Sequence, residues 1–474
     1  MEEAAVELKY SATLASWRWH TFPSTEWALC SPYESRRVSA RLNNRADRFN
    51  ASGRRWLICL PMSHRLQPLA PARLRAPLEP NMTRYHHFLD WACRNWRPAD
   101  GASLDALIGE ARIVSLGEGL HGAHEPLQFR NAWFARLADS QGFSAIGLES
   151  GLAEGLVIDS FVQGDAGDAS SAVSAGITSG LHAFPEQVAL VEWMRAFNSR
   201  SPKRRLGFFG FDTSNAHAAL ERALGFLDAP TAASFRERLA PVWSRLVVDR
   251  RASEPTGYAT LDAAARDAVT AAVADIGVQV ERSDPSDAAL DAALAARQAD
   301  LYLRQIPIGW CTAQGLAGLW ASVALSDRVK AENVERMLHR YGPDGRLLLF
   351  SHVGHASTLP VSIDMAGQRI ELPRMMGHHL HRRFGTAMLT IGHLIGDNQC
   401  QPEVGAASPD SLEGMLATLG QDALLLDLRD APHDVQAELL AAPHPLHGQQ
   451  PIHLLSPGLG VDILFFTARA TPAR

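Results

Sequence analysis

Titratable side chains recur in this chain of 474 residues at the points where short apolar segments end. Glu118 follows one such segment, and His121 comes three residues later. A carboxylate beside an imidazole orients the ring and stabilises its protonated form, which makes the imidazole an effective general base. The spacing of Glu118 and His121 therefore predicts proton-transfer chemistry.

Three further apolar segments end in the same way. The polar residues that follow them are Glu149, Asp212, and His352 with His355. Ligands of open α/β sheets bind beyond the carboxyl ends of the strands, so polar residues at these ends are candidates for a common site. We expect them to gather with Glu118 and His121 in one constellation.

The segments between these residues predict a sheet whose strands are separated by helices. Apolar runs short enough for strands occupy residues 112–116, 144–148, 206–211, 346–350, 388–391, 424–428 and 463–466. Helical patterns occur near residues 125–139, 152–163 and 186–199. This alternation indicates an α/β fold with a mainly parallel sheet flanked by helices.

A long stretch without strand signals separates the third predicted strand from the fourth. Residues 214–340 are rich in Ala, Arg, Leu and Asp, which predicts a large helical insertion packed beside the sheet. We expect this insertion to form a cap beside the active-site cleft. Residues 82–474, insertion included, are predicted to form one α/β domain.

The first 81 residues differ from the rest in charge and in pattern. They carry one Lys and eleven Arg against seven acidic residues, a net +5, and show neither helical nor strand periodicity. Three interpretations stay open: a flexible basic arm, a small poorly packed subdomain, or upstream sequence read from an incorrectly assigned start codon. Regular patterning begins at Met82, so residues 1–81 are treated as a basic leader, disordered or non-native, outside the fold argument.

The overall composition is that of a globular protein, with 46% hydrophobic and 20% charged residues. The net charge of −6 gives no case for nucleic-acid binding, and no apolar run is long enough to predict a membrane-spanning helix. Five cysteines are scattered without a CxxC pair, which fits a reducing compartment. We therefore expect a cytoplasmic protein with neither a nucleic-acid nor a membrane partner.

Several familiar catalytic motifs do not occur in the sequence. It contains no G-x-S-x-G elbow, no phosphate-binding GxxxxGK loop and no HExxH pair. The run HHLH at residues 378–381 follows a proline, and on a helix its members point in different directions. The sequence therefore predicts neither a metal nor another cofactor.

The segment SLGEGLHGAHEPLQFR resembles the opening signature of the erythromycin esterase family, approximately LGE-x-x-HG-x-x-E. The resemblance continues through GFSAIGLESGLAEGLVIDSFVQG, ALVEWMRAFN, GFFGFD, SDRVKAENVERML, GPDGRLLLFSHVGHAS and GTAMLTIG. It extends from about residue 107 to the C-terminus. The resemblance implies an α/β fold with a helical insertion, and hydrolysis of the macrolactone ester of macrolide antibiotics in the family's best-known members.

The resemblance also implies roles for individual residues. His121 takes the position of the general base that removes a proton from water, and Glu118 that of its acidic partner. The other positions implied to be catalytic are Arg130 on the first helix, Glu149 after the second strand, and the histidines His352 and His355. Spacing alone does not tell which of these two histidines acts.

Two departures from the family pattern concern the substrate side of the site. Val353 stands where the family usually has Asn, and His182 and Phe184 lie in a loop where many relatives carry aromatic residues. We therefore expect His182 and Asp212 on the substrate-binding side, with a substrate that need not be a macrolide.

These observations predict a hydrolase that cleaves an ester or lactone of a small molecule, with a macrolide antibiotic as one candidate. His121, oriented by Glu118 or Glu149, deprotonates water, and Arg130 or a second histidine stabilises the oxyanion. One of the two later histidines protonates the departing alkoxide.

Two alternatives stay open. The first is a divalent-metal hydrolase in which Glu118, His121, Glu149 and His355 bind the metal. The second is a non-catalytic binding or polysaccharide-associated protein that retains the fold.

Overall fold

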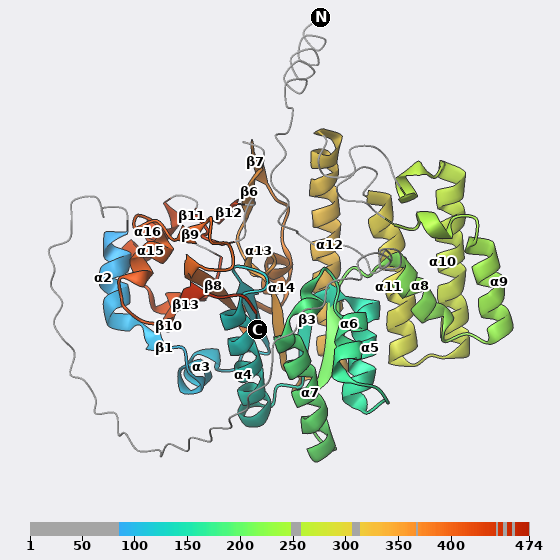
Figure 1. The fold of residues 1–474 in the computed structure, drawn as a ribbon, viewed down its shortest axis with the longest axis horizontal. Helices are drawn as coiled ribbons and strands as arrows, with labels where there is room; N and C mark the ends of the chain where they lie inside the picture. Colours follow the sequence, from blue (N-terminus) through green and yellow to red (C-terminus); the bar gives the residue numbers. More distant parts are fainter. Residues whose placement is uncertain are drawn as a thin grey trace, which may run out of the picture. The chain divides into compact units, whose positions relative to one another are not determined.

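A mixed sheet of nine strands forms the centre of this computed structural model (Figure 1). The structure describes residues 85–247, 257–305, 313–365, 368–441, 444–448, 453–456 and 460–473. The basic leader predicted over residues 1–81 lies outside the described residues. The strand order is β1-β10-β13-β8-β2-β5-β3-β4, with β9 paired to β8.

The central strands are parallel, as the sequence predicts. Pairing is parallel from β13 through β8, β2, β5 and β3 to β4, whereas β1, β9 and β10 pair antiparallel. The strands are β1 Arg97–Pro98, β2 Ile113–Glu118, β3 Ala145–Gly151, β4 Gly207–Asp212, β5 Leu347–His352, β8 Met388–Asn398, β9 Gly405–Ala406, β10 Ala423–Asp427 and β13 Ile463–Ala470.

The buried strands explain why the apolar runs lack alternation. Every residue of β2 is buried, and in β5 the side chains of Leu347 and Leu349 pack into one hydrophobic cluster while Leu348 and Phe350 pack into another. Successive side chains point to opposite faces of a strand. Because helices cover both faces of this sheet, both sets of side chains are apolar.

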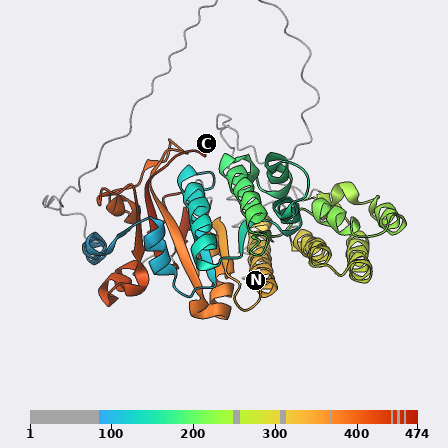
Figure 2. The ribbon, with the colours of Figure 1, turned by 90° about the horizontal axis from the view of Figure 1, so that it is seen from below.

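Helices on both faces complete the α/β layers. Figure 2 shows the neighbouring helices α4 and α7 beside the sheet. These flanking helices are α2 His86–Asn95, α3 Gly101–Ile108, α4 His124–Gln141, α5 Leu152–Gln163, α6 Ala169–Gly176, α7 Pro185–Arg200, α13 Val353–Ala356, α14 Met376–Phe384, α15 Leu412–Ala417 and α16 His433–Leu440. The three helices predicted from periodicity correspond to α4, α5 and α7.

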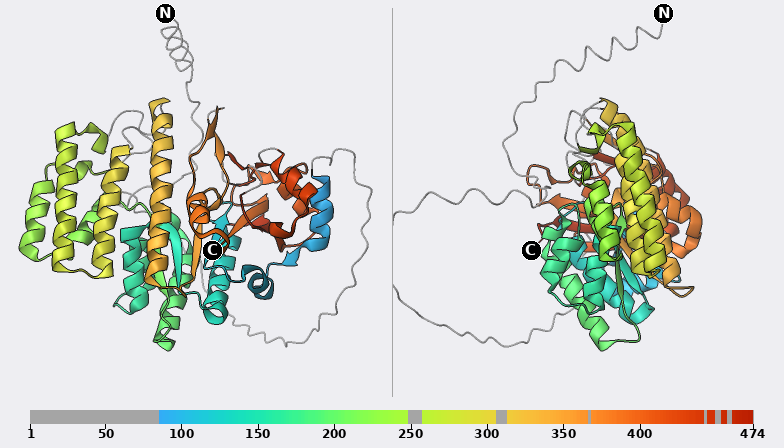
Figure 3. Two further views of the ribbon diagram at one scale, coloured as in Figure 1. Left: turned by 180° about the vertical axis from the view of Figure 1, so that it is seen from behind. Right: turned by 90° about the vertical axis from the view of Figure 1, so that its right-hand side faces the viewer.

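A helical segment follows β4 and lies beside that edge of the sheet, as Figure 3 shows from two further sides. Its helices are α8 Ala216–Leu224, α9 Ala229–Leu239, α10 Ala263–Ser283, α11 Asp287–Gln305 and α12 Ala313–Arg340. Of these, α12 contacts both β4 and α14. The last helix of the segment therefore packs against the edge strand β4 and against α14.

A second, antiparallel sheet of four strands was not predicted. Its order is β11-β12-β6-β7, with β6 Ser362–Met365, β7 Gln368–Glu371, β11 His444–Pro445 and β12 His453–Ser456. These strands have four residues or fewer, too short for a periodicity signal.

Among the described helices, none is long and apolar enough to cross a membrane.

Candidate active site

The carboxyl ends of four neighbouring parallel strands bring the predicted constellation together. In the order β2-β5-β3-β4, these strands end with or close to Glu118, His352, Glu149 and Asp212. Glu118 lies directly opposite His352 in the register of β2 with β5. Residues more than 200 positions apart in the chain therefore lie together at the carboxyl ends of the parallel strands.

Glu118 and His121 form a hydrogen-bonded pair. Glu118 Oε1 lies 2.7 Å from His121 Nδ1; the carboxylate is buried, whereas the His121 side chain is 27% exposed. The chain turns immediately after His121 at Gly122, where φ is +79° and a Cβ would meet the Phe184 ring at 2.8 Å. Glycine at this position thus lets the tight turn present the imidazole at the sheet edge.

The electrostatic surroundings of His121 favour its protonated form. Burial alone would lower the pKa of His121, but the hydrogen bond and negative charge of Glu118, with the charge of Glu149, raise it above the ordinary 6.5. With Nδ1 bound to Glu118, Nε2 is the nitrogen left for other chemistry. The pair therefore has the composition and geometry of a general base with its orienting carboxylate.

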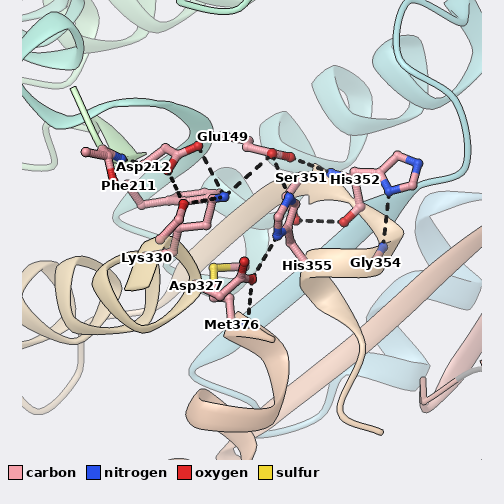
Figure 4. Close-up of polar contacts among 12 residues, drawn as sticks. Glu149, Phe211, Asp212, Asp327, Lys330, Ser351, His352, Gly354, His355 and Met376 are labelled. Carbon is pink, nitrogen blue, oxygen red and sulfur yellow. Dashed lines mark hydrogen bonds and ion pairs between the residues drawn. The ribbon is translucent and has the colours of Figure 1, made fainter. Parts of the chain in front are cut away.

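Glu149 connects three other groups of the cluster (Figure 4). Its Oε1 lies 3.0 Å from His355 Nε2 and 3.8 Å from Lys330 Nζ, and its Oε2 accepts a hydrogen bond from the His352 backbone N–H at 2.8 Å. Burial opposes ionisation, but the charges of His355 and Lys330 hold the pKa of Glu149 well below its ordinary value. The Glu149 side chain is therefore an ionised carboxylate at neutral pH.

His355 lies between two carboxylates. Its Nδ1 is 2.8 Å from Asp327 Oδ1, and its Nε2 faces Glu149. Burial would lower the pKa of His355, but Asp327 and Glu149 raise it to about 10. His355 is thus an imidazolium at neutral pH, with both ring nitrogens occupied.

His352 has the opposite character. Its Nδ1 accepts a hydrogen bond from the Gly354 N–H at 3.3 Å, and its ring centroid lies 5.2 Å from that of His121. Burial, with the nearby positive charge of His121, lowers the pKa of His352 to about 3. The ring is therefore neutral, and because Nδ1 accepts, Nε2 carries the proton. The two histidines that spacing does not distinguish thus differ in charge.

Three polar residues of α12 join the cluster and were not found from the sequence. Asp327 contacts His355, and Lys330 contacts both Glu149 and Asp212; Asp212 Oδ1 also accepts a hydrogen bond from Ser326 Oγ at 2.9 Å. They belong to the helical segment, where no strand end marks a site. Their i, i+3 spacing places two opposite charges on one helix face, but this pattern is also common on exposed helices and does not by itself indicate a site.

Arg130 lies deeper than the strand-end residues. Its guanidinium is fully buried, donates to Asn131 Oδ1 and to Gln187 Oε1, and lies 4.8 Å from the centre of the Phe350 ring. Burial lowers the pKa of Arg130 to about 10, although the negative charges of Glu118 and Glu186 act in the opposite direction and raise it. Arg130 thus remains a cation close enough to Glu118 to influence it.

The loop that carries His182 borders the cluster, but His182 itself is exposed. Within the described part of the chain, no hydrogen bond or ion pair joins His182 to the other predicted site residues. The neighbouring residues of the loop line a narrow cavity of about 10 Å³, which is close to the space of one water molecule. The cavity is lined by Glu118, Leu127, Leu148, Glu149, Ile177, Leu181, Phe184, Gln187, Phe350 and Ser351.

Metal binding was the first alternative for these residues. Across the ranges that the structure describes, no group of three or more His, Cys, Asp or Glu side chains is arranged to hold a metal ion. The carboxylates instead face Nδ1 of His121 and both ring nitrogens of His355.

Comparison with known proteins defines the class. Residues 138–449 match the family model described as erythromycin esterase, and the chain belongs to the erythromycin esterase family. The matched region contains Glu149, Lys330, His352 and His355, whereas Glu118 and His121 precede it.

Two curated relatives come from Escherichia coli. The chain is 24% identical to erythromycin esterase type I over 341 residues, which is 68% of this chain and 80% of that protein. It is 28% identical to erythromycin esterase type II over 114 residues, 24% of this chain and 26% of that protein. The type II alignment thus spans about a quarter of that relative.

Two solved structures share the fold. A succinoglycan biosynthesis protein is 18% identical with a TM-score of 0.65, over 82% of this chain and 98% of that one. A mutant of the erythromycin esterase EreC in its open conformation is 18% identical with a TM-score of 0.56, over 80% and 98% of the two chains. The α/β fold with its helical segment is therefore the erythromycin esterase fold.

Proposed function

We propose that this protein hydrolyses an ester or lactone bond with a water molecule activated by His121. The observation that carries the proposal is the 2.7 Å hydrogen bond between Glu118 and His121. It occupies Nδ1 and leaves Nε2 of a partly exposed ring to accept a proton. Membership of the erythromycin esterase family supports the reaction class.

In the proposed reaction, His121 Nε2 takes a proton from water while the water oxygen attacks the carbonyl carbon. The carbonyl π electrons move to oxygen, and the negative charge of Glu118 stabilises the imidazolium that forms. Collapse of the tetrahedral intermediate breaks the bond to the alkoxide. The alkoxide takes the proton from His121, which returns the ring to its neutral state.

His352 is the best-supported donor to the oxyanion. Its ring is neutral and lies beside that of His121, and its proton is on Nε2. The ring also hydrogen-bonds the Gly119 backbone, and a neutral N–H that turns from this partner to the oxyanion can stabilise developing charge by several kcal/mol. The protonated ring of His355 is held by two carboxylates, so we assign it to the support of Glu149.

Arg130 is proposed to act on the charge of Glu118 from within the protein. Its guanidinium is buried and engaged with Asn131 and Gln187, which supports an electrostatic role over direct contact with the substrate. A buried cation near Glu118 favours the ionised carboxylate that His121 needs.

The proposed substrate is an ester or lactone of a small molecule, with a macrolide as one candidate. The departure from the family pattern at the His182 loop supports a substrate other than erythromycin, whereas Val353 is buried in a hydrophobic cluster. The proposed cap role of the helical segment is supported by the contacts of α12 with the strand-end cluster.

A hydrolysis screen tests the proposal. The full chain is incubated with macrolides, simple lactones and aryl esters, before and after treatment with a chelator, with His121→Asn as the control. We expect turnover of at least one ester class that survives chelation and is lost in the variant. Binding without turnover across the panel would contradict the proposal and favour a non-catalytic protein, and loss on chelation would favour the metal mechanism.

A further inference from the structure

A buried lysine of the helical segment lies between the carboxylates of two neighbouring strands. Lys330, on α12, is 2% exposed. Its Nζ is 3.2 Å from Asp212 Oδ2, 3.2 Å from Ser326 Oγ and 3.8 Å from Glu149 Oε1 (Figure 4). Neither the predicted chemistry nor the proposed reaction uses this residue.

A buried ammonium is costly unless charges and hydrogen bonds compensate it. Asp212 and Ser326 supply close partners, and together they fix the end of the long, otherwise flexible Lys330 side chain. Glu149 is the more distant partner. The Glu149 oxygen that faces Lys330 is Oε1, the same oxygen that contacts His355.

Glu149 in turn fixes the backbone of a residue in the proposed reaction. While its Oε1 faces Lys330 and His355, its other oxygen accepts the hydrogen bond from the His352 N–H. A rotation of the carboxylate would break this bond at the junction of β5 with α13, from which the His352 ring projects. The charge of Lys330 also helps His355 to keep the pKa of Glu149 low.

We propose that Lys330 is a positioning residue, which holds the Glu149 carboxylate in the orientation that fixes the His352 backbone. The proposal rests on the proposed function, because it assigns the helical segment a part in placing the oxyanion donor. The competing explanation is that Lys330 only neutralises Asp212. In that case, Glu149 keeps its place when the charge of Lys330 is removed.

Two neutral variants separate these explanations. Lys330→Met removes the charge and the hydrogen bonds but keeps much of the volume. Lys330→Gln also removes the charge but retains a hydrogen-bond donor for Asp212. It is the variant to use if Lys330→Met does not fold. Lys330→Arg keeps the charge, and Arg328→Met changes an exposed cation on the same helix as a matched control.

The kinetic readout is the separate change in kcat and KM on an ester that the wild-type protein hydrolyses. We expect the neutral variants to lose about 100-fold in kcat, since an error of roughly 1 Å in a reacting group has that effect, with KM within about twofold. Lys330→Arg should recover part of the loss, and Arg328→Met should match the wild type. A kcat within about twofold of the wild type in both neutral variants would overturn the proposal.

Crystal structures of the same variants give a readout that needs no turnover. The proposal predicts that Glu149 rotates and that its hydrogen bond to the His352 N–H is lost in Lys330→Met and Lys330→Gln, but kept in Lys330→Arg. An unmoved Glu149 would overturn the positioning role even if kcat fell. A rotated Glu149 in a chain that hydrolyses no ester would instead support the positioning role and place the failure in the proposed function.

Discussion

Two histidines of the strand-end cluster bind carboxylates, but they differ in how many ring nitrogens are engaged. His121 has one nitrogen on Glu118 and a partly exposed ring. His355 has one nitrogen on Asp327 and the other on Glu149. His121 therefore keeps one ring nitrogen that can accept a proton from water, whereas His355 has no ring nitrogen left for this step.

The difference in partners gives the two rings different proton chemistry. Glu118, with the charge of Glu149, raises the pKa of His121 above its ordinary value against the effect of burial, and Nε2 is left to accept and release a proton. Two carboxylates raise the pKa of His355 to about 10, so its proton stays bound. Two histidines at the same ends of the parallel strands therefore have different roles. His121 can act as a base, whereas His355 remains a cation.

The largest effect is expected from His121→Asn. The amide side chain has no basic nitrogen, so general-base catalysis, worth about 100- to 10,000-fold, is lost. We expect kcat on a hydrolysed ester to fall in this range, with an unchanged circular dichroism spectrum and little change in KM. A folded variant that retains most of its turnover would remove His121 from the reaction.

Glu118→Gln should have a smaller effect of a different kind. The neutral amide does not stabilise an imidazolium, so the pKa of His121 falls and the low-pH limb of activity moves to lower pH. Each unit of pKa corresponds to about tenfold in proton affinity, and because only part of a change in basicity appears in the rate, we expect kcat to fall by less than about tenfold per unit. The pH dependence of kcat in variant and wild type checks this. A reduced kcat with an unmoved limb would mean that Glu118 acts otherwise than on His121.

His355→Gln should affect stability more than the pH limb of activity. The folded pKa of His355, about 10, lies above the ordinary 6.5. The stabilisation is therefore fully present below about pH 6.5 and lost as the pH rises through 10. We expect the wild-type Tm to exceed that of the variant at pH 6 and the gap to narrow towards pH 10, by roughly 1 °C per kcal/mol in a chain of this size.

Thermal unfolding at both pH values measures this gap, and Arg328→Met serves as a control for loss of a cation on the surface. A gap of equal size at both values would show that the His355 charge is not held by Asp327 and Glu149.

Seven strands of the main sheet were predictable because they are apolar and largely buried, whereas the two-residue strands β1 and β9 are partly exposed and were not predicted. Residues 346–350 form one continuous apolar run, and the structure extends this segment to β5 Leu347–His352. The second sheet was not predictable, since strands as short as His444–Pro445 contain no period. Their pairing depends on contacts between distant segments, which one sequence does not reveal.

The strand-end members of the cluster were predictable for the same reason: a polar residue after an apolar run stands out. Asp327 and Lys330 were not, because on an amphipathic helix charged residues usually face water. Only the packing of α12 against β4 turns their face towards the cluster. The difference between His352 and His355 likewise depends on the short helix α13, which directs one ring towards His121 and the other between two carboxylates.

The most direct test of the central claim compares kinetics with titration. The pH dependence of kcat/KM is measured for the wild type, and the histidine rings are titrated by NMR, with the His121 resonance identified by its loss in His121→Asn. We predict that kcat/KM falls at low pH with a midpoint above 6.5, equal to the titration midpoint of His121. A midpoint that matches another histidine, or activity that persists when His121 is fully protonated, would contradict its role as the base.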